Sequence, residues 1–251
     1  MTYLYYADRI YQINLAIAGI AIGTVVLPQL SKLIERENKS EILSIQNKAL
    51  ELSLFLSIPA TIALFIASSL IVSALFGYGS FSVSSVENSA RALFYFSFGL
   101  PAFSLIKVFS SFFFARHDTK TPFYISLISV LLNILISVLF FQKLGFIIIP
   151  IATSISSWFN AITLYIFSKK KDFFIFNDIF LYRFPRILIS SLIMGLFFYF
   201  LLNLLSDKLI YSENLKFIYL LLSILATLIC YVVISIFTKA FQLSDINLKY
   251  K

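Results

Sequence analysis

The sequence has few of the residues on which catalytic and metal sites are usually built. Among its 251 residues there is one cysteine, Cys230, and one histidine, His117. A single cysteine excludes a disulfide within the chain, and so small a set of ligands excludes a zinc cluster. The sequence also lacks a nucleophile, a base and an acid in any arrangement typical of catalysis. We therefore expect a protein that is not an enzyme and that holds no metal or cofactor.

Charged residues are also scarce, at 13% of the chain, whereas soluble domains carry about 25%. Hydrophobic residues make up 60%, and the mean hydropathy is +0.93. These values indicate a polytopic membrane protein rather than a soluble domain. The net charge of +8 comes from basic residues in short connections between apolar runs. It therefore indicates membrane topology and not a nucleic-acid partner.

Long apolar runs are what the sequence contains instead. A helix needs about 20 apolar residues to cross the hydrocarbon core of a bilayer, and a helix satisfies its own backbone hydrogen bonds there. We therefore expect an all-α integral membrane protein with about seven transmembrane helices. The seven runs are Tyr5–Leu30, Leu52–Gly77, Ala90–Phe114, Phe123–Phe141, Gly145–Phe167, Pro185–Leu205 and Phe217–Phe237.

Positive charge is divided unequally between the connections. Successive connections lie on alternate sides of the membrane. The connections on one side, together with the helix ends beside them, hold 15 of the 20 Lys and Arg, and those on the other side hold four. Cytoplasmic segments of membrane proteins are enriched in Lys and Arg, so we expect the C-terminus in the cytoplasm. One of the basic connections, 31–48, mixes charged and apolar residues, which is typical of a short amphipathic helix at the membrane surface.

The first apolar run carries its polar and small residues on one side. If the run is helical, one face carries Arg9, Gln12, Ala16, Gly19 and Gly23. The two glycines would let another helix approach closely. A charge at the centre of a membrane helix costs at least about 2.5–3.5 kcal/mol. Arg9 therefore either lines a polar cavity or extends its side chain to the outer headgroups, and Lys107 has the same two alternatives on the cytoplasmic side.

Ser, Thr and Asn recur at helical spacing in three other runs. Such residues hold membrane helices together whatever the function of the protein, so packing is the first interpretation and cavity lining the second. The third run carries Ser97, Pro101, Ser104, Lys107 and Ser111, the fourth carries Ser126, Ser129, Asn133 and Ser137, and the fifth carries Thr153, Ser156, Asn160 and Thr163.

Two longer stretches resemble the signatures of the MurJ/MviN family. They are YYADRIYQINLAIAGIAIGTVVLPQLS at 5–31 and GLPAFSLIKVFSSFFFARHDTKTP at 99–122. Members of this family are lipid II flippases of the bacterial inner membrane, with two six-helix lobes and two extra helices in a fourteen-helix, MATE-like fold. The resemblance implies that 1–168 is most of the C-terminal lobe, and that 169–251 is a cytoplasmic linker with the two extra helices.

The resemblance also implies roles for single residues. Arg9 occupies the arginine of the family's ADR motif and would bind the pyrophosphate of lipid II, with Asp8, Gln12 and Lys107 nearby. Asn14 stands where the family usually has proline, so a hinge expected in this helix lacks its usual kink. Arg116, Asp118 and Lys120 would fix a cytoplasmic turn and anchor it at the lipid.

We further expect the chain to be incomplete alone, as the C-terminal part of a flippase that needs an N-terminal lobe as partner besides lipid II and membrane lipids. One alternative is a fragment of a MATE-like multidrug or other polyprenyl-lipid exporter. Exporters of that type couple to cations through buried carboxylates, and Asp8 is the only acid we place near the start of a run. The other alternative is a non-transporting remnant of a split gene.

Overall fold

The computed structural model describes the backbone of residues 2–15 and 21–241, and the side chains of residues 2–12 and 26–241. Every secondary-structure element in these ranges is helical, which confirms the all-α prediction. Two short 3₁₀ helices, Gly145–Ile147 and Ser206–Lys208, lie in connections. The α-helices are α1 (Thr2–Leu15), α2 (Ala21–Glu35), α3 (Lys39–Phe76), α4 (Val83–Ser97), α5 (Leu100–Phe114), α6 (Lys120–Leu144), α7 (Ile148–Lys170), α8 (Asp178–Leu204) and α9 (Lys216–Phe237).

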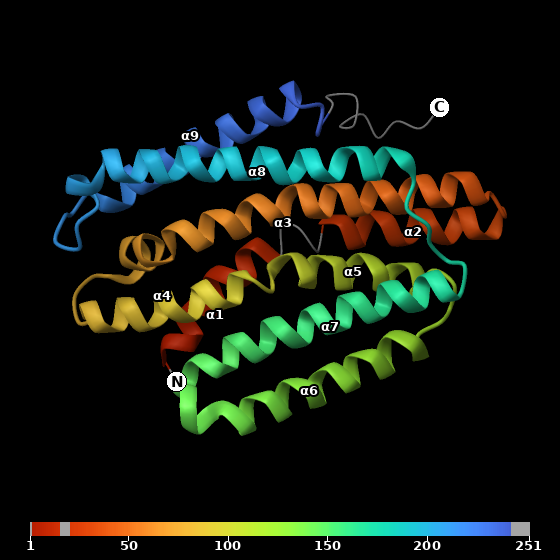
Figure 1. Ribbon diagram of the computed structural model, residues 1–251, viewed down its shortest axis with the longest axis horizontal. Coiled ribbons are helices and arrows are strands. Elements are labelled where there is room, and N and C mark those ends of the chain that lie inside the picture. Colours follow the sequence, from red (N-terminus) through yellow and green to blue (C-terminus); the bar gives the residue numbers. More distant parts are fainter. Residues whose placement is uncertain (1, 16–20, 242–251) are drawn as a thin grey trace.

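The helices run roughly along the long axis of the molecule (Figure 1). Helices α8, α3, α5, α7 and α6 follow one another across the view, and each packs against the next. Helices α1 and α2 lie behind them, and α9 packs on α8. The turns after α2, α5 and α7 share one end of the molecule, and the turns after α3, α6 and α8 share the other.

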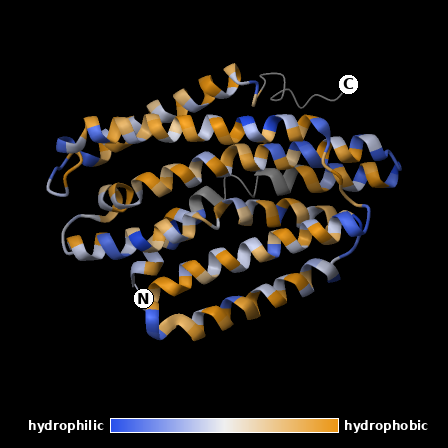
Figure 2. Ribbon diagram, viewed as in Figure 1, coloured by the Kyte–Doolittle hydropathy of each residue, from blue (hydrophilic) through white to orange (hydrophobic). Residues whose placement is uncertain are grey.

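Several helices are long and apolar enough to cross a membrane (Figure 2). In the described residues four helical segments meet this condition, or five if the bent pair of α4 and α5 forms one span. One of the four, Lys120–Lys170, contains both α6 and α7, which turn back on each other at Gly145–Ile147. The first run, Tyr5–Leu30, contains two helices, α1 and α2. The number of seven spans therefore stays a prediction.

The prediction of a separate amphipathic helix at 31–48 is wrong. Helix α2 continues to Glu35, a turn follows, and α3 begins at Lys39 and extends beyond residue 48. The side chain of Asn38 caps α3 by accepting from the backbone N–H of Glu41 at 3.3 Å. Ile42 and Ile45 are buried against other helices. An amphipathic pattern arises whether a helix packs on lipid or on protein, so the sequence could not separate the two.

The buried apolar side chains form two clusters, one toward each end of α3. The first includes Leu50 and Phe112, and the second includes Tyr11 and Leu93. Within the second cluster α3 is kinked at Ala67, which has φ −115° and ψ 17°, and the axes of α4 and α5 differ by 41°. The two bends are neighbours, because the ring of Phe65 lies 4.3 Å from that of Phe94 and 4.9 Å from that of Phe98.

Side chains of α7 satisfy carbonyl groups at the bend between α4 and α5. The N–H of Gly99 donates to Phe96 O at 2.9 Å, so the carbonyl of Tyr95 loses the partner it would have in a continuous helix. Ser154 Oγ donates to this carbonyl at 2.7 Å, and Trp158 Nε1 donates to Phe98 O at 2.9 Å. An unpaired carbonyl is costly in a bilayer, so α7 stabilises the bend.

Candidate functional site

Helix α1 buries one side and exposes the other. The buried residues are at most 6% exposed and recur at helical spacing: Ala7, Ile10 and Tyr11. They pack mainly toward α4, and the ring of Tyr11 also meets that of Phe103 on α5 at 5.4 Å. Arg9 and Gln12 therefore share the exposed face of α1, as their spacing predicts.

The polar side chains of α1 form a short chain of contacts. Arg9 Nη1 donates to Gln12 Oε1 at 3.5 Å, and Gln12 Nε2 donates to Asp8 Oδ2. The guanidinium carbon of Arg9 also lies 4.8 Å from the centre of the Tyr5 ring. Asp8 thus reaches Arg9 through Gln12. Among the described residues these bonds use one of the five N–H donors of Arg9, so the guanidinium keeps donors for a ligand with phosphate oxygens.

The other predicted site residues do not gather around Arg9. Lys107 is exposed on α5, one turn after Phe103, and makes no hydrogen bond or ion pair with any residue in the described ranges. Gly19 lies outside the described residues. Asn14 and Gly23 lie within α1 and α2, and their side chains are likewise outside the description. Whether Arg9 and Lys107 serve one ligand stays a prediction.

The polar residues of α6 and α7 meet around a pocket of about 350 Å³ between α5, α6 and α7. Asn133 Nδ2 donates to Thr153 Oγ1 at 3.1 Å and to Ser156 Oγ at 3.3 Å. Asn160 also lines the pocket, is 6% exposed, and its Oδ1 has no hydrogen-bond partner among the described residues. These residues therefore both join the two helices and line a cavity, so both interpretations of the spacing hold here.

The polar residues expected on one side of the third run do not share a face. The helix is interrupted at Phe98 and Gly99, so Ser97 belongs to α4 and the later residues belong to α5. Ser104 and Ser111 are buried, whereas Lys107 is exposed. Pro101 at the start of α5 was the available sign of this interruption, because proline favours the first turn of a helix.

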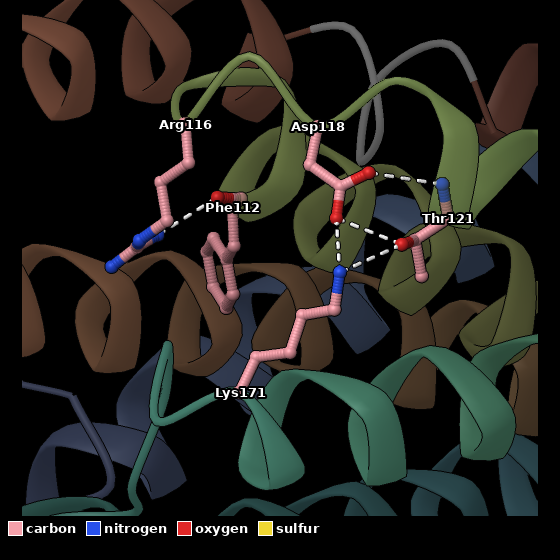
Figure 3. A network of polar contacts seen from close by, with 5 residues as sticks. All are labelled: Phe112, Arg116, Asp118, Thr121 and Lys171. Carbon is pink, nitrogen blue, oxygen red and sulfur yellow. Dashed lines mark hydrogen bonds and ion pairs between the residues drawn. The ribbon is translucent and has the colours of Figure 1, made fainter.

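A second group of polar residues joins the α5–α6 turn to the α7–α8 connection (Figure 3). Lys171 Nζ lies 2.6 Å from Asp118 Oδ2 and 3.0 Å from Thr121 Oγ1. Asp118 Oδ1 accepts from the backbone N–H of Thr121 at 3.0 Å, which caps the start of α6. Arg116 donates to Phe112 O at 2.8 Å and to Phe173 O at 3.2 Å.

The pKa values of Asp118 and Arg116 are both lowered, but for different reasons. Burial would raise the pKa of Asp118, but hydrogen bonds from Lys171 and Thr121 outweigh it and lower the pKa. Burial lowers the pKa of Arg116. Arg116 and Asp118 thus fix the turn, as expected. Lys120 is exposed at the start of α6, and its contact with lipid stays a prediction.

The helical bundle contains a buried acid that was not expected from the sequence. Glu51 of α3 pairs with Arg183 of α8 at 3.0 Å, and both side chains are at most 13% exposed. Glu51 directly precedes the run Leu52–Gly77, so placing only Asp8 near the start of a run was wrong. The apolar run marks the hydrophobic part of α3, whereas the helix itself starts at Lys39.

Lys216, at the start of α9 and directly before the run Phe217–Phe237, is a second buried charge. It is 2% exposed. Its ammonium donates to Gly77 O at 2.8 Å and to Tyr211 O at 2.7 Å. The same group lies 4.4 Å and 4.5 Å from the ring centres of Tyr78 and Tyr211. Its partners stand far away in sequence, so composition alone could not reveal the contact.

Comparisons with known proteins agree on one family. The family model described as "Lipid II flippase MurJ" matches residues 1–221. Probable lipid II flippases MurJ of Rhizobium meliloti (strain 1021) and Rickettsia prowazekii (strain Madrid E) are each 39% identical to this chain, over 192 and 168 residues. The alignments cover 76% and 67% of this chain but 36% and 33% of the relatives. The chain therefore spans about a third of their length.

The fold leads to the same family. A solved structure of lipid II flippase MurJ in an inward closed conformation superposes with a TM-score of 0.76 at 28% identity. The superposition covers 95% of this chain and 47% of that one. Since sequence and fold agree over most of the chain, this multi-pass membrane protein belongs to the MurJ family of lipid II flippases.

Proposed function

We propose that this chain is the C-terminal part of a transporter that moves lipid II, a lipid-linked peptidoglycan precursor, across the bacterial inner membrane. Its family membership supports this assignment, because the relatives are named for that substrate. The relatives are about three times as long as the matched region, so we propose that transport requires an N-terminal lobe. In this proposal 1–168 supplies most of one lobe, and 169–251 supplies the linker and two further helices.

Arg9 is the residue that carries the proposal. It is a charged, exposed side chain on a helix whose other side is packed against α4. A guanidinium binds phosphate oxygens through two parallel hydrogen bonds and stays charged in any environment. Gln12 and Tyr5 would orient Arg9 toward the pyrophosphate, with Asp8 holding Gln12. Lys107, exposed on α5, would add a second positive charge to the cavity that we propose the headgroup occupies between the two lobes.

Transport would proceed by alternating access, in which two lobes tilt about the bound headgroup without any covalent step. The direction follows from the distribution of charge. The turns after α2, α5 and α7 share one end of the molecule (Figure 1), and the segments around these turns, 31–48, 116–120 and 169–186, carry 11 of the 20 Lys and Arg. We therefore propose that this end and the C-terminus lie in the cytoplasm, and that Arg9 lies toward the opposite side.

Complementation of depleted cells tests the proposal. The chain would be co-expressed with the N-terminal lobe of a relative in bacteria depleted of their own flippase. We expect growth with the wild-type chain, loss of growth with Arg9→Ala, and partial growth with Arg9→Lys, which keeps the charge but not the fork. Arg91→Ala is the matched control, because Arg91 is also exposed, on α4. Full growth with Arg9→Ala at equal membrane levels would exclude the role of Arg9.

A further inference from the structure

An apolar groove of about 530 Å³ lies between α3, α5, α7 and α8. Leu54 of α3 and Leu105 of α5 form its floor, and Ile162 of α7 and Leu188 of α8 form its sides. Its surface consists of carbon atoms of apolar and aromatic side chains. The four helices lie next to one another in Figure 1, so the groove follows their common direction.

Aromatic rings close the groove at the connection between α7 and α8. Phe176 stacks on Phe180 at 4.7 Å, and Phe180 stacks on Phe184 at 5.7 Å. Tyr165 of α7 lies 5.2 Å from Phe176 and completes the closed end. These four aromatic side chains all line the groove, so its wall at this end consists of packed rings.

The rims of the groove are exposed. Ile162 is 51% exposed and Leu181 is 57% exposed, on helices that are long and apolar enough to cross a membrane. Within a bilayer the groove therefore opens to lipid. Water would have no hydrogen-bond partner in it. A hydrocarbon chain, in contrast, would gain dispersion contacts along its whole length.

Basic residues stand just beyond the closed end. Lys169 lies one helical turn after Tyr165 on α7, and both Lys169 and Lys170 are exposed. The third lysine, Lys171, is paired with Asp118. The connection also carries the exposed acids Asp172 and Asp178. Because Lys171 is already paired, Lys169 and Lys170 are the exposed lysines at this end of the groove, and Lys169 follows the lining residue Tyr165 by one turn. Their two ammonium groups can bind the phosphate of an anionic headgroup.

The groove is separate from the proposed substrate site. Its lining residues come from α3, α5, α7, α8 and the α7–α8 connection, whereas Arg9 and Gln12 lie on α1. We propose that this groove binds a membrane phospholipid, with an acyl chain between α7 and α8 and an anionic headgroup held by Lys169 and Lys170. The inference does not depend on the proposed transport function.

Photo-crosslinking in nanodiscs tests the site. The purified chain would be reconstituted with a phospholipid that carries a diazirine on its acyl chain and either a phosphatidylglycerol or a phosphatidylcholine headgroup. Crosslinked peptides would then be identified by mass spectrometry. We expect crosslinks concentrated on the groove faces of α7 and α8, with phosphatidylglycerol preferred by about fivefold for each contributing lysine.

Two kinds of variant separate the chain site from the headgroup site. Ile162→Trp should fill the groove and reduce its crosslinks several-fold, whereas Ile134→Trp on α6, at a matched exposure of 53%, should not. Lys169→Gln with Lys170→Gln should remove the headgroup preference and keep the acyl crosslinks. Lys143→Gln with Lys208→Gln is the control at the opposite end.

Three outcomes would overturn the proposal. The first is labelling of α6 at the same rate as the groove faces. The second is unchanged groove labelling in Ile162→Trp. The third is equal use of the two headgroups by the wild-type chain.

Discussion

Lys216 is 2% exposed, and its ammonium lies between two carbonyl oxygens and two tyrosine rings. Arg183 is similarly fixed by Glu51. Charges that a fold buries need such partners, because desolvation of an ion is costly. Arg9 differs, since it is exposed and makes one long side-chain hydrogen bond with Gln12. At the scale of single residues, this contrast distinguishes charges that hold helices together from one that is available to a ligand.

Asp118 gives a prediction for pH dependence. Its folded-state pKa is lowered by hydrogen bonds from Lys171 and Thr121. Ionised Asp118 therefore stabilises the folded state above the unfolded pKa of about 3.9, and this contribution is lost as the pH falls through the lower folded value. We expect Asp118→Asn to lower the stability at neutral pH by less than about 1 kcal/mol, since Lys171 is half exposed.

Thermal unfolding in detergent at neutral pH and near pH 3 would measure the effect. Asparagine can still cap α6, so the variant removes the charge and keeps the cap. The difference in melting temperature between the wild type and Asp118→Asn should be smaller near pH 3 than at neutral pH. Asp207→Asn, at an exposed acid in the α8–α9 connection, serves as the control. A difference that stays constant with pH would contradict the assigned contribution of the charge.

At the scale of helices, apolar composition located most of the elements. Hydropathy depends on local residues, so the apolar runs in the sequence predicted the positions of α6, α7, α8 and α9 to within several residues. The start of α3 at Lys39 and its kink at Ala67 could not, because both depend on packing between distant segments. The same holds for the site. Spacing predicted that Arg9 and Gln12 share a face, whereas the pairing of Glu51 with Arg183 joins residues 132 positions apart.

The bend between α4 and α5 gives a prediction about α7. Trp158→Phe removes the donor to Phe98 O, and Ser154→Ala removes the donor to Tyr95 O. Hydrogen bonds between membrane helices contribute about 0.6 kcal/mol on average and about 1.7 kcal/mol at most. We expect each variant to lose stability in this range, measured by unfolding in detergent. Thr163→Ala is the control, because Thr163 donates only to Phe159 O of its own helix. Equal losses in all three variants would contradict a specific role at the bend.

At the scale of the whole molecule, both ends of the helices carry distinct sets of turns, and the basic set is gathered at one end. Positive charge therefore gives the bundle a direction in the membrane, independent of any single contact. The proposed ligand site and the polar group that fixes the α5–α6 turn lie at opposite ends of the bundle. Arg9 stands on α1 near the N-terminal end, whereas the Asp118 group stands at the opposite end.

Cysteine labelling in intact cells tests this orientation. Cys230 is the only cysteine in the sequence, so Cys230→Ser gives a background without thiols. We expect a membrane-impermeant maleimide to label Asn214→Cys, in the α8–α9 connection, and to leave Glu35→Cys, at the end of α2, unlabelled until the cells are opened. Both positions are exposed. The reverse pattern would invert the proposed topology.

The adjacent bends in α3 and between α4 and α5 have a mechanical consequence. Helices α6, α7 and α8 pass this level without a break, whereas the rings of Phe65, Phe94 and Phe98 couple the two bends. A change of angle at one bend is therefore transmitted to the other, while the continuous helices resist it. The first apolar cluster, with Leu54 and Val108, lies on one side of both bends and can move as one unit, whereas the second, with Leu64 and Leu100, extends across both bends and must repack when either angle changes.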